Sequence, residues 1–300
     1  MSAAVHEEIE PPTPEFFRDL CTWAVATAER VTEEGVWMRR ERLLLAEETG
    51  WPEEVKETQT LHVTPSGPAW CRMEQAEWPA LRLVIVHGGD TPIAIHMVED
   101  FLRRWPRVTI WAQNLLEEPP AEFAGRIRVL PLFEQDRRWR GGSETICTVL
   151  GGERATAILY PFCNPATNPI RRVWLEQVRA CRGEREDMEV IPHPIPKEEY
   201  EAALAGARAV VCPPGNGVDT HRCWETLYHG GWAIVQDSTH TRLLLAEWPD
   251  LPLLPVRDAA ELTSLVVPVE APARLHPILF REWWVREVED LLAASTHTAA

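Results

Sequence analysis

Two charged side chains and a glycine-containing loop between Cys212 and Glu225 have the chemistry to bind a phosphorylated ligand. The stretch 210–235 predicts a strand, a glycine loop, a helix, a glycine turn and a second strand. Backbone N–H groups of Gly215, Asn216 and Gly217 could approach an anion closely, because glycine lacks a side chain and can adopt positive φ. The start of the following helix also suits an anion, since free N–H groups and the helix dipole point at it.

Arg222 and Glu225 stand three positions apart, so a helix presents both on one face. A cation beside a phosphate site and a carboxylate one turn further along suit a nucleotide, with its phosphate at Arg222 and its ribose hydroxyls at Glu225. Each has a structural alternative: Arg222 could form an internal ion pair, and Glu225 could be an exposed helical acid. Asp219 or Thr220 is expected to cap the helix, and ligand contact by Asp219 is an equal alternative.

Alternating strands and helices are expected to position these residues. Short apolar runs predict strands at 81–87, 108–111, 126–130, 155–160, 188–191, 209–211, 232–235 and 253–254. Helices are predicted at 15–48 with a break near Gly35, and at 96–105, 170–181, 197–205, 221–229, 241–248, 258–265 and 278–294. This alternation predicts an α/β protein with two Rossmann-like domains, at 1–150 and 151–277, and a C-terminal helix at 278–300 that packs back on the first. In a fold of this kind, ligands are expected to bind at the carboxyl ends of the strands.

Composition and charge narrow the classes of partner. The chain has 300 residues and a formal net charge of −16, which opposes nonspecific binding to nucleic acid or anionic membranes. Residues 101–140 carry a local excess of arginine, which is either a solvated face or a contact surface. Seven cysteines without a Cys-x-x-Cys pair indicate reduced thiols and a cytoplasmic protein. Neither a signal peptide nor a membrane span is expected.

The order of several motifs resembles that of exostosin-like glycosyltransferases. The strongest match is Cys-Pro-x-Gly-Asn-Gly-x-Asp-x-His-Arg-x-x-Glu-x-Leu-x-x-Gly, from Cys212 to Gly230. Weaker matches precede it in the family's order, at Val86–Asp90, Trp111–Asn114, Pro131–Gly141 and Phe162–Arg171. Two departures, Gly88-Gly89 for Asn-Ser and Phe133-Glu134 for Ile-Gly, alter the loops of the first domain, and residues 1–80 match nothing in the family.

The resemblance implies the GT-B fold, in which two Rossmann-like domains face each other across a deep cleft. It implies transfer of a sugar from a nucleotide-diphosphate donor, a UDP-sugar, to a hydroxyl acceptor, with inversion and without a metal. The donor-binding residues carried over are Pro214, Gly215, Asn216, Gly217, Asp219, Thr220, His221, Arg222 and Glu225, together with Asn168 and Arg171. Arg222 would also stabilise the leaving diphosphate. For Asn168 and Arg171, the start of a helix at Pro169 is the equal alternative.

Inverting transfer needs a base that deprotonates the acceptor hydroxyl. Asp90 is the candidate, because it follows a strand of the first domain, and His87 is the second. A turn-capping role for Asp90 is the alternative. A metal site is not expected, because His221 and Cys223 stand two positions apart on a helix and point in different directions.

The acceptor and two rival functions stay open. A glycan or small molecule is the first expectation for the acceptor. The alternative is DNA with hydroxymethylated bases, as used by some viral enzymes of this fold in the host cytoplasm, with Arg137, Arg138 and Arg140 as the contact surface. The rival functions are a noncatalytic nucleotide-binding module and a zinc hydrolase.

Overall fold

The chain forms two compact units. The computed structural model describes residues 5–26, 43–46, 51–64, 66–87, 92, 94–133, 146–150 and 153–297. Unit 1 comprises Met1–Pro11 and Phe133–Phe280, and unit 2 comprises Pro12–Leu132 and Arg281–Ala300. The sequence-based division placed the corresponding boundaries after residues 150 and 277. Each unit contains a parallel sheet flanked by helices, so the predicted α/β architecture is confirmed and is consistent with two Rossmann-like units.

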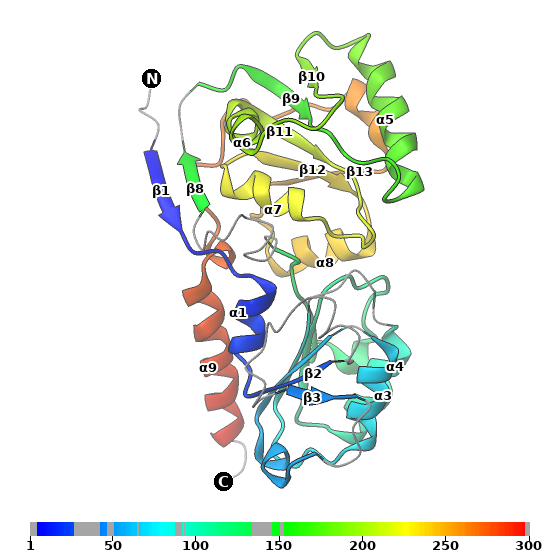
Figure 1. The fold of residues 1–300 in the computed structure, drawn as a ribbon, viewed down its shortest axis with the longest axis vertical. Coiled ribbons are helices and arrows are strands. Elements are labelled where there is room, and N and C mark those ends of the chain that lie inside the picture. Colours follow the sequence, from blue (N-terminus) through cyan, green and yellow to red (C-terminus); the bar gives the residue numbers. More distant parts are fainter. Residues whose placement is uncertain are drawn as a thin grey trace. The chain divides into compact units, whose positions relative to one another are not determined.

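Unit 1 is built around a five-stranded parallel sheet in the order β10-β9-β11-β12-β13 (Figure 1). Its strands are β9 (Thr156–Tyr160), β10 (Met188–Val190), β11 (Ala207–Cys212), β12 (Trp232–Gln236) and β13 (Leu253–Val256). Its helices are α5 (Pro169–Arg182), α6 (Lys197–Gly206), α7 (His221–Tyr228) and α8 (Thr239–Glu247), with 3-10 turns η4 (Ala259–Thr263) and η5 (Pro277–Leu279). A separate antiparallel pair joins β1 (Val5–Ile9) to β8 (Ile146–Leu150).

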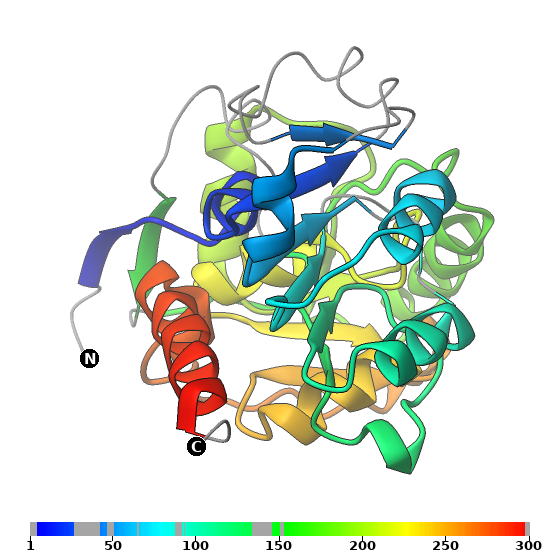
Figure 2. The same cartoon turned by 90° about the horizontal axis from the view of Figure 1, so that it is seen from below.

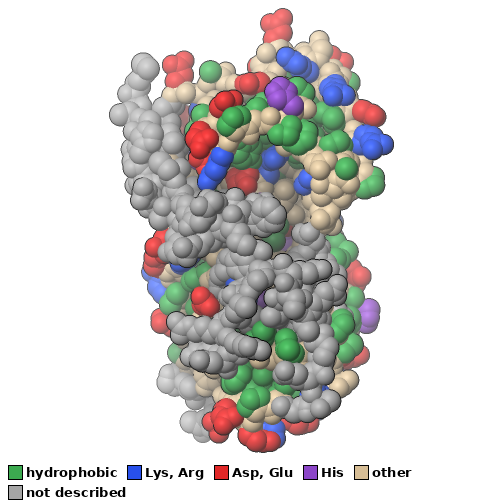
Figure 3. Space-filling view, in the orientation of Figure 1, with side chains coloured by type: hydrophobic (Ala, Val, Ile, Leu, Met, Phe, Trp, Pro, Cys, Tyr) green, Lys and Arg blue, Asp and Glu red, His purple; other side chains and the backbone are tan. Residues whose placement is uncertain are grey.

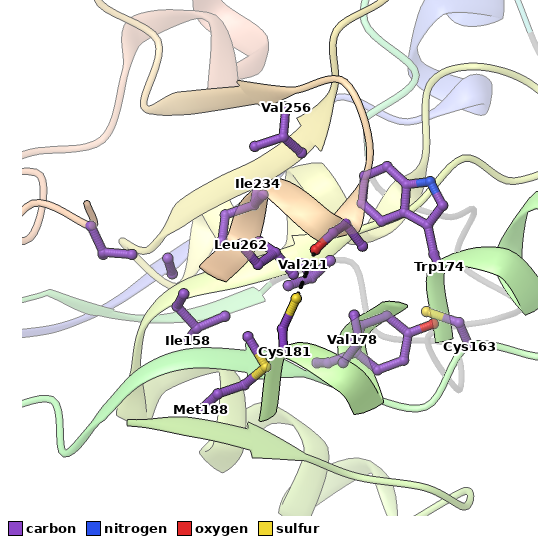
Figure 4. Packing of buried hydrophobic residues seen from close by; sticks show 14 residues of the cluster. Ile158, Cys163, Trp174, Val178, Cys181, Met188, Val211, Ile234, Val256 and Leu262 are labelled. Carbon is purple, nitrogen blue, oxygen red and sulfur yellow. Dashed lines mark hydrogen bonds between the residues drawn. The ribbon is translucent and has the colours of Figure 1, made fainter. Parts of the chain in front are cut away.

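The core of unit 1 lies between the sheet and the buried face of α5. Trp174, Val178 and Cys181 recur at helical spacing on α5 and are all buried. They pack against Ile158 and Val211 of the sheet (Figure 4). Burial of apolar surface of this kind contributes about 25 cal/mol for each Å² removed from water. The packing therefore holds the start of α5 close to the carboxyl ends of the central strands.

Unit 2 contains a six-stranded parallel sheet in the order β3-β2-β4-β5-β6-β7. Its strands are β2 (Trp23–Ala26), β3 (Leu43–Leu45), β4 (Thr60–Val63), β5 (Leu83–Val86), β6 (Thr109–Ala112) and β7 (Ile127–Val129). Its helices are α1 (Pro14–Asp19), α3 (Gly67–Gln75), α4 (Ile95–Arg104) and α9 (Arg281–His297), with 3-10 turns η2 (Glu53–Glu57) and η3 (Ala121–Phe123).

Helices cover both faces of the six-stranded sheet. In Figure 1, α1 and α9 lie on one side of it and α3 and α4 on the other, and Figure 2 shows the same division from below. Trp284 of α9 contacts Phe17 of α1 and Trp111 of β6, each with ring centroids 5.4 Å apart. Arg128 of β7 adds an ion pair of 3.0 Å with Glu287 of α9. The C-terminal helix is thus a structural part of unit 2.

Of the predicted helix over residues 15–48, only the part up to Asp19 is helical among the described residues, and residues 27–42 and 47–48 lie outside them. Helix α1 ends at Asp19, and the next apolar run, Trp23–Ala26, forms β2. Its residues pair in parallel with β3 and β4, so tertiary pairing overrides the helical spacing of this short segment. Strands β3 and β4 and helix α3 were not predicted. Residues 258–265, predicted as a helix, form only the 3-10 turn η4.

The remaining predicted elements between residues 81 and 256 are present within a few residues of their expected bounds. The glycine turn after α7 is also present. Gly230 has a φ of 66°, a left-handed conformation that glycine adopts without the steric cost that a side chain would add. No helix among the described residues has the length and apolar character needed to cross a membrane.

Candidate functional site

The residues singled out in unit 1 gather where the order of its sheet reverses. Strand β9 comes first in sequence, β10 lies on one side of it and β11 on the other. The connections that leave β9 and β11 therefore run in opposite directions from these two neighbouring strands. Open α/β sheets bind their ligands at such a point. Residues 161–168 follow β9 and residues 213–220 follow β11, so both loops meet there.

Side chains from the start of α5 hold the loop after β11. Arg171 donates from Nε to the carbonyl oxygen of Pro214 at 2.8 Å. Asn168 donates from Nδ2 to the carbonyl oxygen of Gly215 at 2.5 Å. The same Asn168 caps α5, since its Oδ1 accepts from the N–H of Ile170 at 3.0 Å. Of the two roles expected of Asn168, the structure shows the helix-start role, and contact with a donor stays a prediction.

The orientation of these two carbonyls sets the orientation of the loop's N–H groups. In a planar trans peptide the carbonyl and the following N–H point in opposite directions. Because the carbonyls of Pro214 and Gly215 face α5, the N–H groups of Gly215 and Asn216 face away from it. Among the described glycines only Gly125 and Gly230 have positive φ, so Gly215 does not use the conformational freedom expected of it. Its missing side chain instead makes room for Arg171, whose Nη2 would lie 3.3 Å from an added Cβ.

The guanidinium of Arg222 is anchored to the loop after β9. Its Nη1 donates to the carbonyl oxygens of Pro161 and Phe162, at 3.2 and 3.0 Å, and to Sγ of Cys163 at 2.7 Å. Burial alone would lower the pKa of Arg222, but Tyr200, Cys163 and Glu225 outweigh this effect and hold the pKa above its usual value. A permanently charged group therefore lies at the junction of the two loops.

Tyr200 of α6 joins Arg222 to Glu225. Its hydroxyl accepts from Nε of Arg222 at 3.2 Å and donates to Oε2 of Glu225. The centre of the guanidinium also lies 5.5 Å from the centroid of the Tyr200 ring. Burial and then the charge of Glu225 raise the pKa of Tyr200 well above its usual value, so the phenol keeps its proton and remains the donor.

Asp219 belongs to a buried network and does not cap α7 through its side chain. Its carboxylate accepts from the N–H of Thr220 at 2.7 Å and from Nε1 of Trp224 at 2.9 and 3.0 Å. Nε2 of His240 lies 3.3 Å from the same carboxylate. Thr220 is the N-cap residue, but its side chain forms no capping hydrogen bond. The helix therefore begins after Thr220, one of the two expected cap positions, but without the side-chain hydrogen bond that a cap usually supplies.

The other predicted donor-binding residues lie along the same loop. Nδ1 of His221 donates to the carbonyl oxygen of Phe133 at 2.8 Å, and this bond places the proton on Nδ1. Pro214 and Gly217 are buried, whereas Asn216 is exposed. The structure thus places the predicted residues of unit 1 on or beside the loops that follow β9 and β11, and it engages Asp219 and His221 in bonds to the protein itself.

Of the predicted residues outside unit 1, the structure describes His87. His87 of unit 2 is fully buried, with Nε2 3.3 Å from the carbonyl oxygen of Pro131 and its ring 5.0 Å from that of Phe17. Asp90 lies outside the described residues, as do Arg137, Arg138 and Arg140.

Two observations concern metals and charge. The described residues contain no group of three or more His, Cys, Asp or Glu side chains that could hold a metal ion. Acidic and basic side chains lie next to one another on the face of unit 1 visible in Figure 3.

Sequence reasoning missed two members of the site, Tyr200 and Cys163. Tyr200 stands 22 positions before Arg222, and Cys163 stands 59 positions before it. No local spacing connects residues so far apart. The signals that could have found them are general ones: Tyr200 is one of only three tyrosines, and Cys163 stands three positions after the predicted buried strand at 155–160.

Comparison with known proteins leaves the family of this chain open. No protein-family model matches the sequence, and no curated protein matches it significantly.

Proposed function

We propose that the protein is a glycosyltransferase of the GT-B type whose unit 1 binds a nucleotide-diphosphate sugar, a UDP-sugar, as the donor. One observation carries the proposal: at the carboxyl ends of β9 and β11, Tyr200 joins a guanidinium to a carboxylate, beside a loop whose N–H groups face away from α5. A cation and N–H donors suit a diphosphate, and a carboxylate suits ribose hydroxyls.

In this proposal each residue has a separate task. Arg222 pairs with the diphosphate and stabilises the charge that develops on it when the bond to the sugar breaks. Glu225 accepts hydrogen bonds from the ribose. Asn168 and Arg171 act indirectly, because their observed bonds hold the loop. Asp90 stays the predicted base of an inverting transfer. The positive groups already present support a reaction that needs no metal.

Ligand-induced stabilisation tests the donor site. A ligand that binds only the folded state raises the melting temperature, so UDP-, GDP-, CDP- and ADP-sugars are compared at equal concentration, with and without EDTA. We expect one base to give a clear shift that EDTA does not abolish. The variants Arg222→Lys and Glu225→Gln should lose most of it. Both variants keep the approximate size of the side chain. Arg222→Lys removes the planar guanidinium, and Glu225→Gln removes the negative charge.

A matched control separates loss of binding from loss of fold. Glu201 lies on α6, pairs with Lys197 at 3.5 Å and is partly exposed, away from the described bonds of the site. Glu201→Gln should therefore keep the full shift. No shift with any of the four donors would contradict the donor site.

The transfer itself needs a second readout. Release of nucleoside diphosphate from the stabilising donor, with candidate glycans, small molecules or hydroxymethylated DNA present, is expected to be lost in Glu225→Gln. A donor that binds well but is neither hydrolysed nor transferred would instead favour the noncatalytic nucleotide-binding module.

A further inference from the structure

We propose that Tyr200 is a positioning residue that makes the proposed donor site selective for ribonucleotides over 2′-deoxyribonucleotides. This inference rests on the proposed function, since it assigns a source of selectivity within the same site. The hydroxyl of Tyr200 binds one polar atom of Arg222 and one of Glu225, and one further polar atom of each side chain forms no hydrogen bond within the described residues.

Tyr200 uses one oxygen of Glu225 and leaves the other. Its hydroxyl donates to Oε2. Oε1 has no hydrogen-bond partner among the described residues and is not sealed from solvent. A carboxylate on an otherwise unrestrained helical side chain can rotate about its last torsion, because that torsion is broad. The bond from Tyr200 removes this freedom and leaves Oε1 as the acceptor at a defined place.

Arg222 likewise has bonded nitrogens and one nitrogen without a bond among the described residues. Its Nε donates to Tyr200, and its Nη1 donates to the loop after β9. Within the described parts of the chain no hydrogen bond engages Nη2, and Arg222 as a whole is only partly buried. The guanidinium is planar and rigid. Anchoring two of its nitrogens therefore sets the direction of the third.

The bonds of Tyr200 therefore hold the donor Nη2 of Arg222 and the acceptor Oε1 of Glu225 in a fixed arrangement relative to each other. A ligand that satisfies both needs a hydrogen-bond donor for Oε1 of Glu225 and an acceptor for Nη2 of Arg222. The ribose hydroxyls and the phosphate oxygens of a nucleotide supply this combination. We assign the 2′-hydroxyl to Oε1; because the carboxylate cannot turn to find another donor, the loss of this hydroxyl leaves Oε1 unpaired at the ligand. Unpaired polar groups of this kind are a strong source of discrimination.

Removing the hydroxyl of Tyr200 should therefore affect selectivity more than stability. In Tyr200→Phe, Glu225 regains its rotation and Arg222 loses one anchor, while the ring keeps its packing. We expect the wild type to bind the ribonucleoside diphosphate about tenfold more tightly than its 2′-deoxy form, or better. In Tyr200→Phe this ratio should fall to about twofold, mainly through weaker binding of the ribose form.

Tyr228 provides a matched control. It is a buried tyrosine of the same unit, and its hydroxyl bonds to the carbonyl oxygen of Leu279 at 3.2 Å rather than to the site. Tyr228→Phe removes the same atom from a similar environment. It is expected to lower the melting temperature of the free protein at least as much as Tyr200→Phe does, and to keep the wild-type ratio.

The experiment is calorimetric titration of the three proteins with UDP, GDP, CDP and ADP and with their 2′-deoxy counterparts. A ratio that collapses in Tyr200→Phe alone supports the proposal. A wild-type ratio in Tyr200→Phe overturns it and leaves the donor site standing. If Tyr200→Phe weakens the binding of the ribose and 2′-deoxy forms equally, Tyr200 has only a structural role, and the proposal is overturned as well. If the wild type binds none of the eight nucleotides, the proposed donor site fails, and this inference fails with it.

Discussion

Tyr200 donates a hydrogen bond to Glu225, although 25 positions separate the two residues in the sequence. The bond joins α6 to α7 beside the point where the order of the five-stranded sheet reverses. It also connects the carboxylate to Arg222, because the same hydroxyl accepts from Nε of that residue. The polar groups of the candidate site therefore act as one unit, and changing any of them should disturb the others.

The bond from Asn168 to the loop after β11 can be separated from its role as a helix cap. Asn168→Ser keeps a capping oxygen but loses the donor to Gly215, and should cost about 1 kcal/mol of unfolding free energy. Asn168→Ala loses both bonds and should cost about 2 kcal/mol. Both variants should bind the donor nucleotide with similarly reduced affinity. Denaturant titration and ligand-induced melting shifts measure the two effects. A full shift in the serine variant would show that the loop does not depend on this bond.

The carboxylate of Asp219 should contribute mainly to stability. In the wild type the carboxylate of Asp219 accepts from the N–H of Thr220, from Nε1 of Trp224 and from Nε2 of His240. Asp219→Asn replaces one of its oxygens by an NH2 group, which donates and cannot accept. We expect a loss of about 2 kcal/mol in denaturant unfolding, with altered fluorescence of the buried tryptophan.

Asp237→Asn is the control for Asp219→Asn. Asp237 pairs with Arg242 at 2.8 Å in a half-exposed position, so its replacement should cost under about 1 kcal/mol. Equal costs for the two variants would argue against a special role for the buried network.

The buried His229 predicts that unit 1 loses stability in mild acid. Burial and then the charge of Arg154 lower the pKa of His229 to about 4. The unfolded chain, with a histidine pKa of about 6.5, binds the proton more readily than the folded chain. The contribution of neutral His229 to the free energy of unfolding is therefore fully present above pH 6.5. It is lost as the pH falls towards 4, by about 3 kcal/mol in total. Denaturant titrations at pH 7.0, 5.5 and 4.5 measure this loss.

Replacing the histidine identifies its share of the pH dependence. His229→Leu should flatten the profile between pH 6.5 and 4, whereas replacement of the exposed His193 by Gln should leave the profile as it is. His62 acts in the same direction in unit 2, because burial, Arg18 and His87 lower its pKa. An unchanged slope in His229→Leu would assign the acid sensitivity to other groups.

The C-terminal helix should be essential for unit 2. Trp284 is buried between the rings of Phe17 and Trp111, so Trp284→Ala should cost about 3–5 kcal/mol of unfolding free energy. The neighbouring Trp283 is only partly buried, and Trp283→Ala should cost clearly less. Thermal unfolding followed by tryptophan fluorescence compares the two. Similar losses would indicate that packing by the whole helix, rather than by Trp284, dominates.

The amino-acid sequence by itself determined the alternating elements from residue 81 onward and the loop-helix motif of Gly215–Glu225. Both depend on local patterns: buried parallel strands are short apolar runs, and residues three positions apart share a helix face. The same kind of reasoning failed at Trp23–Ala26, where helical spacing was present but pairing with β3 and β4 made a strand.

Only the tertiary structure decided which side chains surround that motif. Sheet order brings the loop after β9 to Arg222, packing of α6 brings Tyr200 to Glu225, and α8 supplies His240 to Asp219. These pairs lie 21 to 60 positions apart, beyond the reach of any helix or strand period. Their formation depends on the order in which strands pair and on the burial of each helix face, which are properties of the folded chain as a whole.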